Sequence, residues 1–141
     1  MSTLERAIEI AASAHAGQFD KAGEPYILHP LRVMLRVSTP EERIAAVLHD
    51  VVEDTKVSLE ALRSEGFSPG VIAAVEALTK RPGESRLEAA GRAAANVIAL
   101  AVKLADNAEN MDLRRIRFPT ERDHARVEEY KAVRQVLLKH Q

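Results

Sequence analysis

The sequence predicts an all-α protein, a compact single-domain helical bundle formed by residues 1–141. Hydrophobic residues make up 46% of the chain and aromatic residues only 4%, a balance that favours helices packed on helices over strands. Apolar residues recur at helical spacing along most of the chain, between cap and Gly or Pro signals. A chain of 141 residues can bury one core and is too short for two ordinary domains.

Capping signals predict where most helices begin. Ser2 and Glu5 have the spacing of a capping box. Thr39 and Glu42 have the same spacing, with Pro40 at the first helical position, where its missing N–H has no consequence. Helices are therefore expected over residues 3–15, 40–52, 87–95 and 97–111, and also after His29 to about Val37, from Ser58, from Ser68, and from Thr120 or Glu121 to the C-terminus.

Residues 17–30 interrupt the helical pattern. This segment holds two Gly and two Pro and ends at His29-Pro30. Because Gly and Pro break regular structure, we expect a long loop here, and loops of this length commonly carry function.

Charge and composition exclude several classes of partner. The formal net charge is −1, so no strong positive field attracts a nucleic-acid backbone, and no nucleic acid is expected. The chain has no cysteine, so any metal must be bound by imidazole and carboxylate groups. No segment approaches the ~20 apolar residues that span a bilayer, and the N-terminus lacks a secretion signal. We therefore expect a cytoplasmic protein without a membrane partner, and the oligomeric state is left open.

Charged residues follow an otherwise apolar helix at His49-Asp50. Asp50, Glu53 and Asp54 are spaced i, i+3 and i+4, so they share one helical face. Crowded carboxylates repel one another unless a cation lies among them. The C-terminal end of a helix is also the unfavourable end for negative charge. The pattern indicates a bound cation, although a solvated helix end would also carry such charges.

Two further segments carry polar residues of interest. Lys103, Asp106 and Asn110 are spaced i, i+3 and i+7 on an apolar helix. The alternative is a simple intrahelical Lys–Asp pair. His29 follows the Gly- and Pro-rich segment, and the alternative there is a loop histidine without a function.

In their order and spacing, these motifs resemble those of HD-domain phosphohydrolases, specifically the hydrolase domain of the RelA/SpoT family and its stand-alone small alarmone hydrolases. The likeness extends over nearly the whole chain. It is carried by Ala14-His15, Gly17-Gln18, Lys21-Ala22-Gly23, Pro25-Tyr26-Ile27, His29-Pro30-Leu31, His49-Asp50-Val51-Val52-Glu53-Asp54-Thr55, Leu78-Thr79-Lys80, Lys103-Leu104-Ala105-Asp106 and Asn110-Met111.

The resemblance implies a bundle of the HD-domain type around one divalent ion, usually manganese. Two imidazole nitrogens and two carboxylates suit manganese and do not exclude iron or zinc. The ligands that the family implies are His29, His49, Asp50 and Asp106.

The family reaction removes pyrophosphate from the 3′ position of the alarmone ppGpp and leaves GDP. The resemblance implies that Glu53 and Asp54 position and deprotonate the attacking water. The substrate contacts that it implies are Lys21, Asn110, Arg126 and Tyr130. Of these, Arg126 and Tyr130 are spaced i and i+4 and could hold one phosphate group together.

Several positions depart from the family pattern, among them Asp20 and Asn107. Asp20 stands where the family has an Arg that stacks on guanine, and Asn107 follows Asp106 where the family tends to have Arg or Lys. These changes leave open an HD phosphohydrolase that acts on another phosphorylated metabolite. A non-catalytic nucleotide-sensing module is a third hypothesis, which the loss of a metal ligand or of the acidic pair would favour; all of these residues are present.

The remaining basic side chains have weaker expectations. His15 is expected to pack in the interior, and His124 and His140 to be solvated. A basic cluster between the last two predicted helices could attract an anionic substrate or could be a solvated surface; it consists of Arg114, Arg115 and Arg117.

Overall fold

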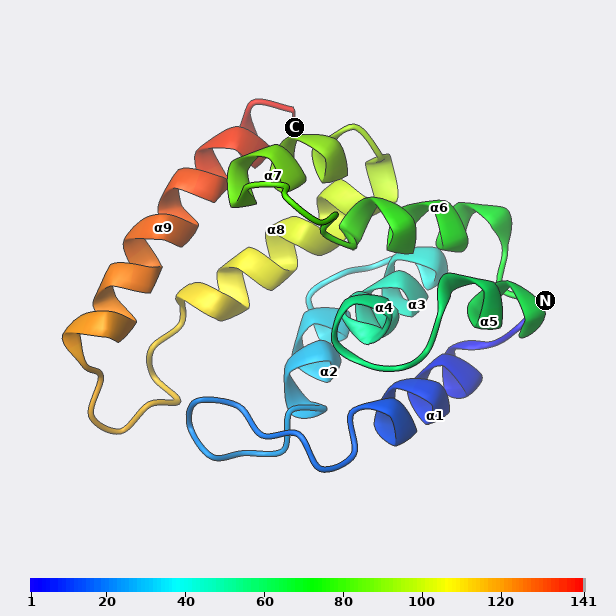
Figure 1. Ribbon diagram of the computed structural model, residues 1–141, viewed down its shortest axis with the longest axis horizontal. Helices are drawn as coiled ribbons and strands as arrows, with labels where there is room; N and C mark the ends of the chain where they lie inside the picture. Colours follow the sequence, from blue (N-terminus) through cyan, green and yellow to red (C-terminus); the bar gives the residue numbers. More distant parts are fainter. Residues whose placement is uncertain (141) are drawn as a thin grey trace.

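Polar side chains begin most of the helices. The computed structural model describes residues 1–140 (Figure 1). A Ser, Thr or Asn side chain accepts a hydrogen bond from the first turn of every helix except α2 and α4. The described part of the chain contains no β-strand, which confirms the predicted all-α class. The helices are α1 (Leu4–Ala14), α2 (Leu28–Leu35), α3 (Pro40–Leu48), α4 (Val51–Asp54), α5 (Leu59–Ser64), α6 (Pro69–Leu78), α7 (Arg86–Ala94), α8 (Val97–Met111) and α9 (Glu121–Leu138).

The helix predicted over residues 40–52 is divided in two, so its predicted continuity was wrong. α3 ends at Leu48, His49 and Asp50 form a turn, and α4 begins at Val51. Nδ1 of His49 lies 2.5 Å from the carbonyl oxygen of Ala46. A side chain thereby satisfies a carbonyl that the next turn of helix would otherwise bind. The break places His49 and Asp50 between two helices.

Two helix starts also differ from the prediction. The cap of α1 is Thr3, whose hydroxyl accepts from the amide of Arg6 at 3.1 Å, and not Ser2. α2 begins before His29 and includes it in the first turn. Pro30 is tolerated there because the amides of a first helical turn have no intrahelical acceptor. His29 is therefore held on a helix and not on a loop.

The core consists of three apolar clusters, two of which meet at α3. The first lies between α1, α3, α4, α5 and α6, and the second between α2, α3, α6, α7 and α8. α3 contributes to both, and it contacts α1, α2, α6 and α8. Figure 1 shows α3 and α4 in the middle of the molecule, with α1 and α9 on opposite sides. The ends of α3 and α4 are thus surrounded by packed helices.

The third cluster fixes α9 against α7 and α8. Val133 and Leu137 are buried in it, whereas Val127 and Tyr130 are only partly buried. Asn107 is buried on α8, and its amide donates to the backbone carbonyl of Tyr130 at 2.9 Å. This bond sets the position of α9 beside α8. None of the helices in residues 1–140 is both long enough and apolar enough to cross a membrane.

Candidate metal and substrate site

Three segments that are far apart in the sequence meet at a buried cluster of His29 from α2, His49 after α3 and Asp106 from α8. Each offers one ligand atom, and these atoms lie within 4.8 Å of one another. Nε2 of His29 is 2.8 Å from Oδ1 of Asp106, and Nε2 of His49 is 3.3 Å from the same oxygen. All three side chains are buried. The structure thus brings together three of the four ligands that the resemblance implies.

Asp50, the fourth expected ligand, lies at the edge of this cluster. Its Oδ2 is 3.1 Å from Nε2 of His49 and accepts a hydrogen bond from the hydroxyl of Tyr26. The side chain is half-buried and faces the same space as Asp106. A small movement of the carboxylate would complete a set of two imidazoles and two carboxylates.

The ring of His49 indicates that this group can hold a cation. Its Nδ1 faces a carbonyl oxygen and therefore carries the proton, which leaves a lone pair on Nε2. Nε2 is buried and makes no hydrogen bond to any described residue, and it faces the carboxylates of Asp50 and Asp106. A lone pair opposite two carboxylates is favourable only with positive charge between them. Imidazole and carboxylate donors in this arrangement fit a divalent metal ion.

The electrostatics of the cluster also favour a cation. Burial lowers the pKa of His49, but the charges and close contacts of Asp50 and Asp106 outweigh it and raise the pKa well above its ordinary value, so that either a proton or a metal ion at Nε2 supplies the positive charge. Burial raises the pKa of Asp106, but Lys103 and the two histidines outweigh it and hold the pKa well below the ordinary value. The site therefore keeps its carboxylates ionised and attracts positive charge.

Asp106 is held by its own helix as well. Nζ of Lys103 lies 3.4 Å from Oδ2, and the amide of Asn110 donates to Oδ1 at 3.2 Å. The predicted shared face of α8 is therefore present, and so is the intrahelical Lys–Asp pair that was its alternative. Both fix the carboxylate that joins the two imidazoles.

A cavity of about 430 Å³ opens beside the cluster. Its walls come from the loop before α2, from the loop after α8 and from α9. Its lining includes Tyr26, His29, Asp50 and Asp106, and also all four expected substrate contacts, Lys21, Asn110, Arg126 and Tyr130.

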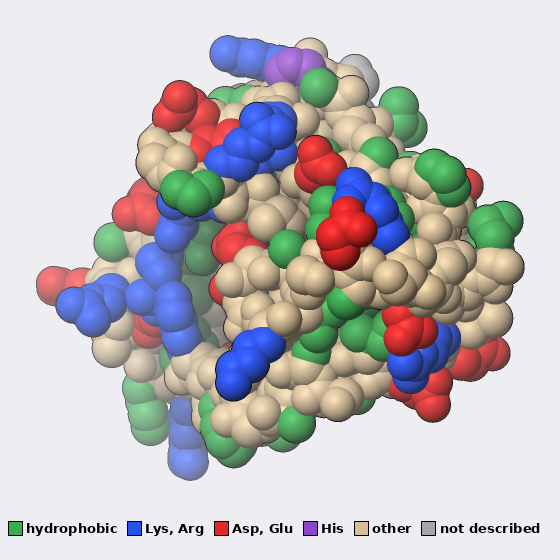
Figure 2. Space-filling view, turned by 45° about the vertical axis from the view of Figure 1, so that its right-hand side comes forward, with side chains coloured by type: hydrophobic (Ala, Val, Ile, Leu, Met, Phe, Trp, Pro, Cys, Tyr) green, Lys and Arg blue, Asp and Glu red, His purple; other side chains and the backbone are tan. Residues whose placement is uncertain are grey.

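A second cavity, of about 280 Å³, is also lined by Asp106. It shares Asp50, Asp106, Asn110 and Tyr130 with the first, so the two form one two-lobed site. Its basic lining residues are Lys80, Arg86 and Lys103. Figure 2 shows Lys and Arg side chains along the rim of a hollow in one face of the molecule, with acidic side chains beside it.

The two expected catalytic acids are placed differently. Glu53 lines the second cavity, and its Oε1 accepts from the backbone amide of Lys80 at 2.7 Å. Asp54 lines neither cavity. Its pKa is raised, first by partial burial and then by the charges of Asp50 and Glu53. Of the two acids, Glu53 is therefore the one that faces a cavity of the site.

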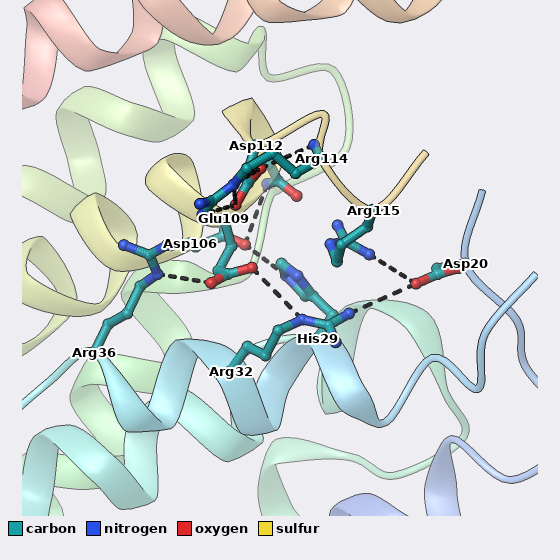
Figure 3. Close-up of polar contacts among 10 residues, drawn as sticks. Asp20, His29, Arg32, Arg36, Asp106, Glu109, Asp112, Arg114 and Arg115 are labelled. Atoms are coloured by element: carbon teal, nitrogen blue, oxygen red, sulfur yellow. Dashed lines mark hydrogen bonds and ion pairs between the residues drawn. The ribbon is translucent and has the colours of Figure 1, made fainter. Parts of the chain in front are cut away.

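Asp20 is engaged with cations and does not project a free charge into the cavity (Figure 3). Nη1 of Arg115 lies 2.9 Å from Oδ2, and Nη2 of Arg32 lies 3.8 Å from the same oxygen. Oδ1 accepts from the backbone amides of Ala22 and Glu24. The pair joins the loop before α2 to the loop after α8. This ion pair could not be predicted from local sequence, because Asp20 and Arg115 are 95 residues apart.

The structure also places the remaining histidines and the predicted basic cluster. His15 is buried against Tyr26, while His124 and His140 are exposed, as predicted. In the basic cluster, Arg115 lines the larger cavity, whereas Arg114 and Arg117 are exposed. The cluster therefore includes one residue of the site and two solvated ones.

Residues 7–138 match the HD domain family, and the chain belongs to this family. A GTP pyrophosphokinase of Streptomyces coelicolor is 38% identical over 121 residues, which cover 77% of this chain and 14% of that protein. A guanosine-3′,5′-bis(diphosphate) 3′-pyrophosphohydrolase of Aquifex aeolicus is 43% identical over 81 residues, which cover 55% of this chain and 12% of that protein. The chain spans no more than 16% of the length of these curated relatives.

A solved structure has a similar fold over almost the whole chain. It is described as "A metazoan ortholog of SpoT hydrolyzes ppGpp and plays a role in starvation responses". The similarity has a TM-score of 0.77 at 25% identity and covers 99% of this chain and 85% of that one. The predicted HD-domain fold and the resemblance to ppGpp hydrolases are thereby confirmed.

Proposed function

We propose that this chain is a metal-dependent phosphohydrolase that removes pyrophosphate from the 3′ position of ppGpp. The observation that carries the proposal is the buried cluster of His29, His49 and Asp106, open to a cavity that Lys21 and Arg126 line. The names of the Aquifex aeolicus relative and of the solved structure support ppGpp as the substrate.

The cluster and Asp50 would hold one divalent ion, most suitably Mn²⁺. Two imidazole nitrogens and two carboxylate oxygens leave further coordination positions free, and such mixed nitrogen and oxygen donors suit this metal. When bound, the ion would supply Lewis acidity, which makes water easier to deprotonate and offsets negative charge on a phosphoryl group.

Glu53 is the proposed general base. It faces the second cavity beside His49 and Asp50, and the Lys80 amide orients its carboxylate. It would accept the proton of the attacking water as the oxygen bonds to phosphorus and the bond to the 3′ oxygen breaks, and it would return this proton to the 3′ oxygen, which leaves pyrophosphate and the 3′ hydroxyl of GDP. Asp54 would assist through its negative charge, which lies close to Glu53 and would stabilise the proton that Glu53 accepts.

Lys21 and Arg126 would bind the phosphate groups of the substrate. Burial lowers the pKa of Lys21, and the nearby positive charge of Arg126 lowers it further. Two neighbouring cations at a cavity wall are stabilised by an anion between them. Tyr130 and Asn110 line both cavities and would donate to oxygens of the same ligand.

A second candidate substrate is a different phosphorylated metabolite. The observation that favours it is Asp20, which occupies the wall of the larger cavity and takes up the guanidinium of Arg115. This wall therefore presents no free cationic plane on which guanine could stack.

A release assay distinguishes the candidates. The protein, supplemented with Mn²⁺, is incubated with ppGpp and with a panel of other phosphorylated nucleotides, and pyrophosphate, phosphate and the remaining nucleotide are quantified. Formation of GDP and pyrophosphate from ppGpp is the expected result. Turnover of another compound alone would support the second candidate, and binding without any turnover would contradict a hydrolase.

A further inference from the structure

Tyr26 connects the loop before α2 to the candidate metal site. Its hydroxyl donates a hydrogen bond to Oδ2 of Asp50, the one expected ligand that lies outside the closest group. We infer that Tyr26 is a positioning residue for metal binding, whose hydroxyl holds the Asp50 carboxylate toward the ion that the two histidines and Asp106 would bind. This inference rests on the ligand set proposed above and assigns a role to a residue outside that set.

The backbone around Asp50 leaves its side chain little other restraint. Asp50 precedes α4 as the N-cap, but its carboxylate makes no capping hydrogen bond to that helix. Within residues 1–140, the groups that reach the carboxylate at bonding distance are the Tyr26 hydroxyl and the His49 ring. Nε2 of His49 is itself an expected metal ligand, so the hydroxyl is the one partner whose role is to orient the carboxylate.

Tyr26 itself is firmly placed. Its backbone amide donates to the carbonyl of Gln18 at 2.9 Å. Its ring lies between two histidine rings, with centroids 5.0 Å from His15 and 5.6 Å from His29. His15 is in turn fixed by a contact of 2.8 Å between its Nδ1 and Oε1 of Gln18. These contacts give the Tyr26 hydroxyl a defined position although the residue lies in a loop.

The chemistry of the bond suits orientation more than coordination. A neutral phenol donates one hydrogen bond, and a carboxylate oxygen has a second lone pair that stays available to a metal. Partners that orient metal ligands in this way typically change metal affinity by about 10- to 100-fold when they are removed. Loss of the hydroxyl should therefore weaken metal binding and leave the chemical step intact.

The test compares the two tyrosines of the chain, Tyr26 and Tyr130. Both line the larger cavity, but no hydrogen bond joins the Tyr130 hydroxyl to a described residue. Mn²⁺ affinity is measured by calorimetry, without nucleotide, for the wild type, Tyr26→Phe and Tyr130→Phe. Phe keeps the ring between the histidines and removes only the hydroxyl. We expect about 10- to 100-fold weaker binding for Tyr26→Phe and wild-type affinity for Tyr130→Phe.

Two additional measurements separate orientation from other roles. At saturating Mn²⁺, kcat of Tyr26→Phe should return to within a few-fold of the wild-type value. In a double-mutant cycle, Tyr26→Phe should have little further effect on affinity once Asp50 is replaced by Asn, because the two residues act through one contact. Thermal unfolding without metal checks that each variant is folded, and the cycle provides a second readout if Tyr26→Phe alone is destabilised.

Several outcomes would overturn the inference. Wild-type Mn²⁺ affinity in Tyr26→Phe would do so, as would equal weakening in Tyr130→Phe or full additivity with Asp50→Asn. If the wild type binds no Mn²⁺, the proposed ligand set fails together with the inference. If the metal results are as expected but ppGpp is not hydrolysed, the proposed substrate fails and the role of Tyr26 stands.

Discussion

His49 uses its two ring nitrogens for two different purposes. Nδ1 satisfies a carbonyl at the end of α3, and Nε2 faces the carboxylates of Asp50 and Asp106. The interruption of an apolar helix by charge was enough to indicate His49 and Asp50 from the sequence. The role of Tyr26 could not be predicted in this way, since its partner is 24 residues away and nothing local marks the contact.

Asp106→Asn should abolish stoichiometric Mn²⁺ binding. The carboxylate contacts both imidazoles, and the amide keeps its shape but loses its charge. Bound manganese is measured by elemental analysis after gel filtration. Asp112→Asn is the control, because Asp112 lines the larger cavity but pairs with Arg114. One retained equivalent of manganese in Asp106→Asn would show that the ligand set is wrong.

Glu53→Gln should keep the metal and lose turnover. The amide can still accept from Lys80, whose amide lies 2.7 Å from the Glu53 carboxylate, but it cannot take a proton from water. We expect kcat to fall by about 10²- to 10⁴-fold, with unchanged Mn²⁺ affinity, in steady-state assays with ppGpp. A variant that turns over at the wild-type rate would exclude Glu53 as the base.

At the scale of helices, most N-caps could be predicted from the sequence, whereas the break between α3 and α4 could not. Thr39, Ser68 and Thr120 cap their helices as expected, because a cap is a local contact over three residues. The division between α3 and α4 depends on one histidine side chain, and apolar periodicity continues across it. The site is located at this division.

A side chain of α7 binds carbonyls at the C-terminal end of α6. The guanidinium of Arg92 on α7 donates to the carbonyls of Glu76 and Thr79 at 3.2 and 2.6 Å and pairs with Glu84 at 2.8 Å. These bonds give donors to two carbonyls at the C-terminal end of α6, of which that of Glu76 also accepts from the amide of Thr79. The pair therefore fixes the connection that carries Lys80.

Glu84 should make the stability of the protein sensitive to acid. The hydrogen bond from Arg92 and the amide of Arg81 lower the pKa of Glu84 from 4.5 to about 2. A depressed pKa in the folded state adds stability above pH 4.5, and this stability is lost as the pH falls toward 2. In urea titrations, Glu84→Gln should be less stable than the wild type at neutral pH and approach it near pH 2. A difference that does not depend on pH would contradict this assignment.

At the scale of the molecule, two apolar clusters pack against α3, and a third holds α9 against α7 and α8, which carries Asp106. The sequence predicted the class of this bundle, because hydrophobic periodicity and length decide it. It could not predict which loops meet over the cavity. The two loops are joined by the ion pair of Asp20 and Arg115, which are 95 residues apart in the sequence.

Leu48→Ala should test the central position of α3. Leu48 is fully buried in the first cluster at the end of the helix. Its truncation should lower the free energy of unfolding by about 2–5 kcal/mol, measured by urea denaturation. Leu35→Ala is the matched control, because Leu35 is 77% exposed and should change stability by less than about 0.5 kcal/mol. Equal effects of the two substitutions would show that α3 is not central to the core.

The most direct test of the proposed metal site is the position of a bound metal ion. Crystals grown with Mn²⁺ would be measured near the manganese absorption edge, and an anomalous difference map would be calculated. We predict one strong peak in contact with Nε2 of His29 and His49 and with carboxylate oxygens of Asp106 and Asp50. A peak elsewhere, or no peak at saturating Mn²⁺, would contradict the proposed metal site.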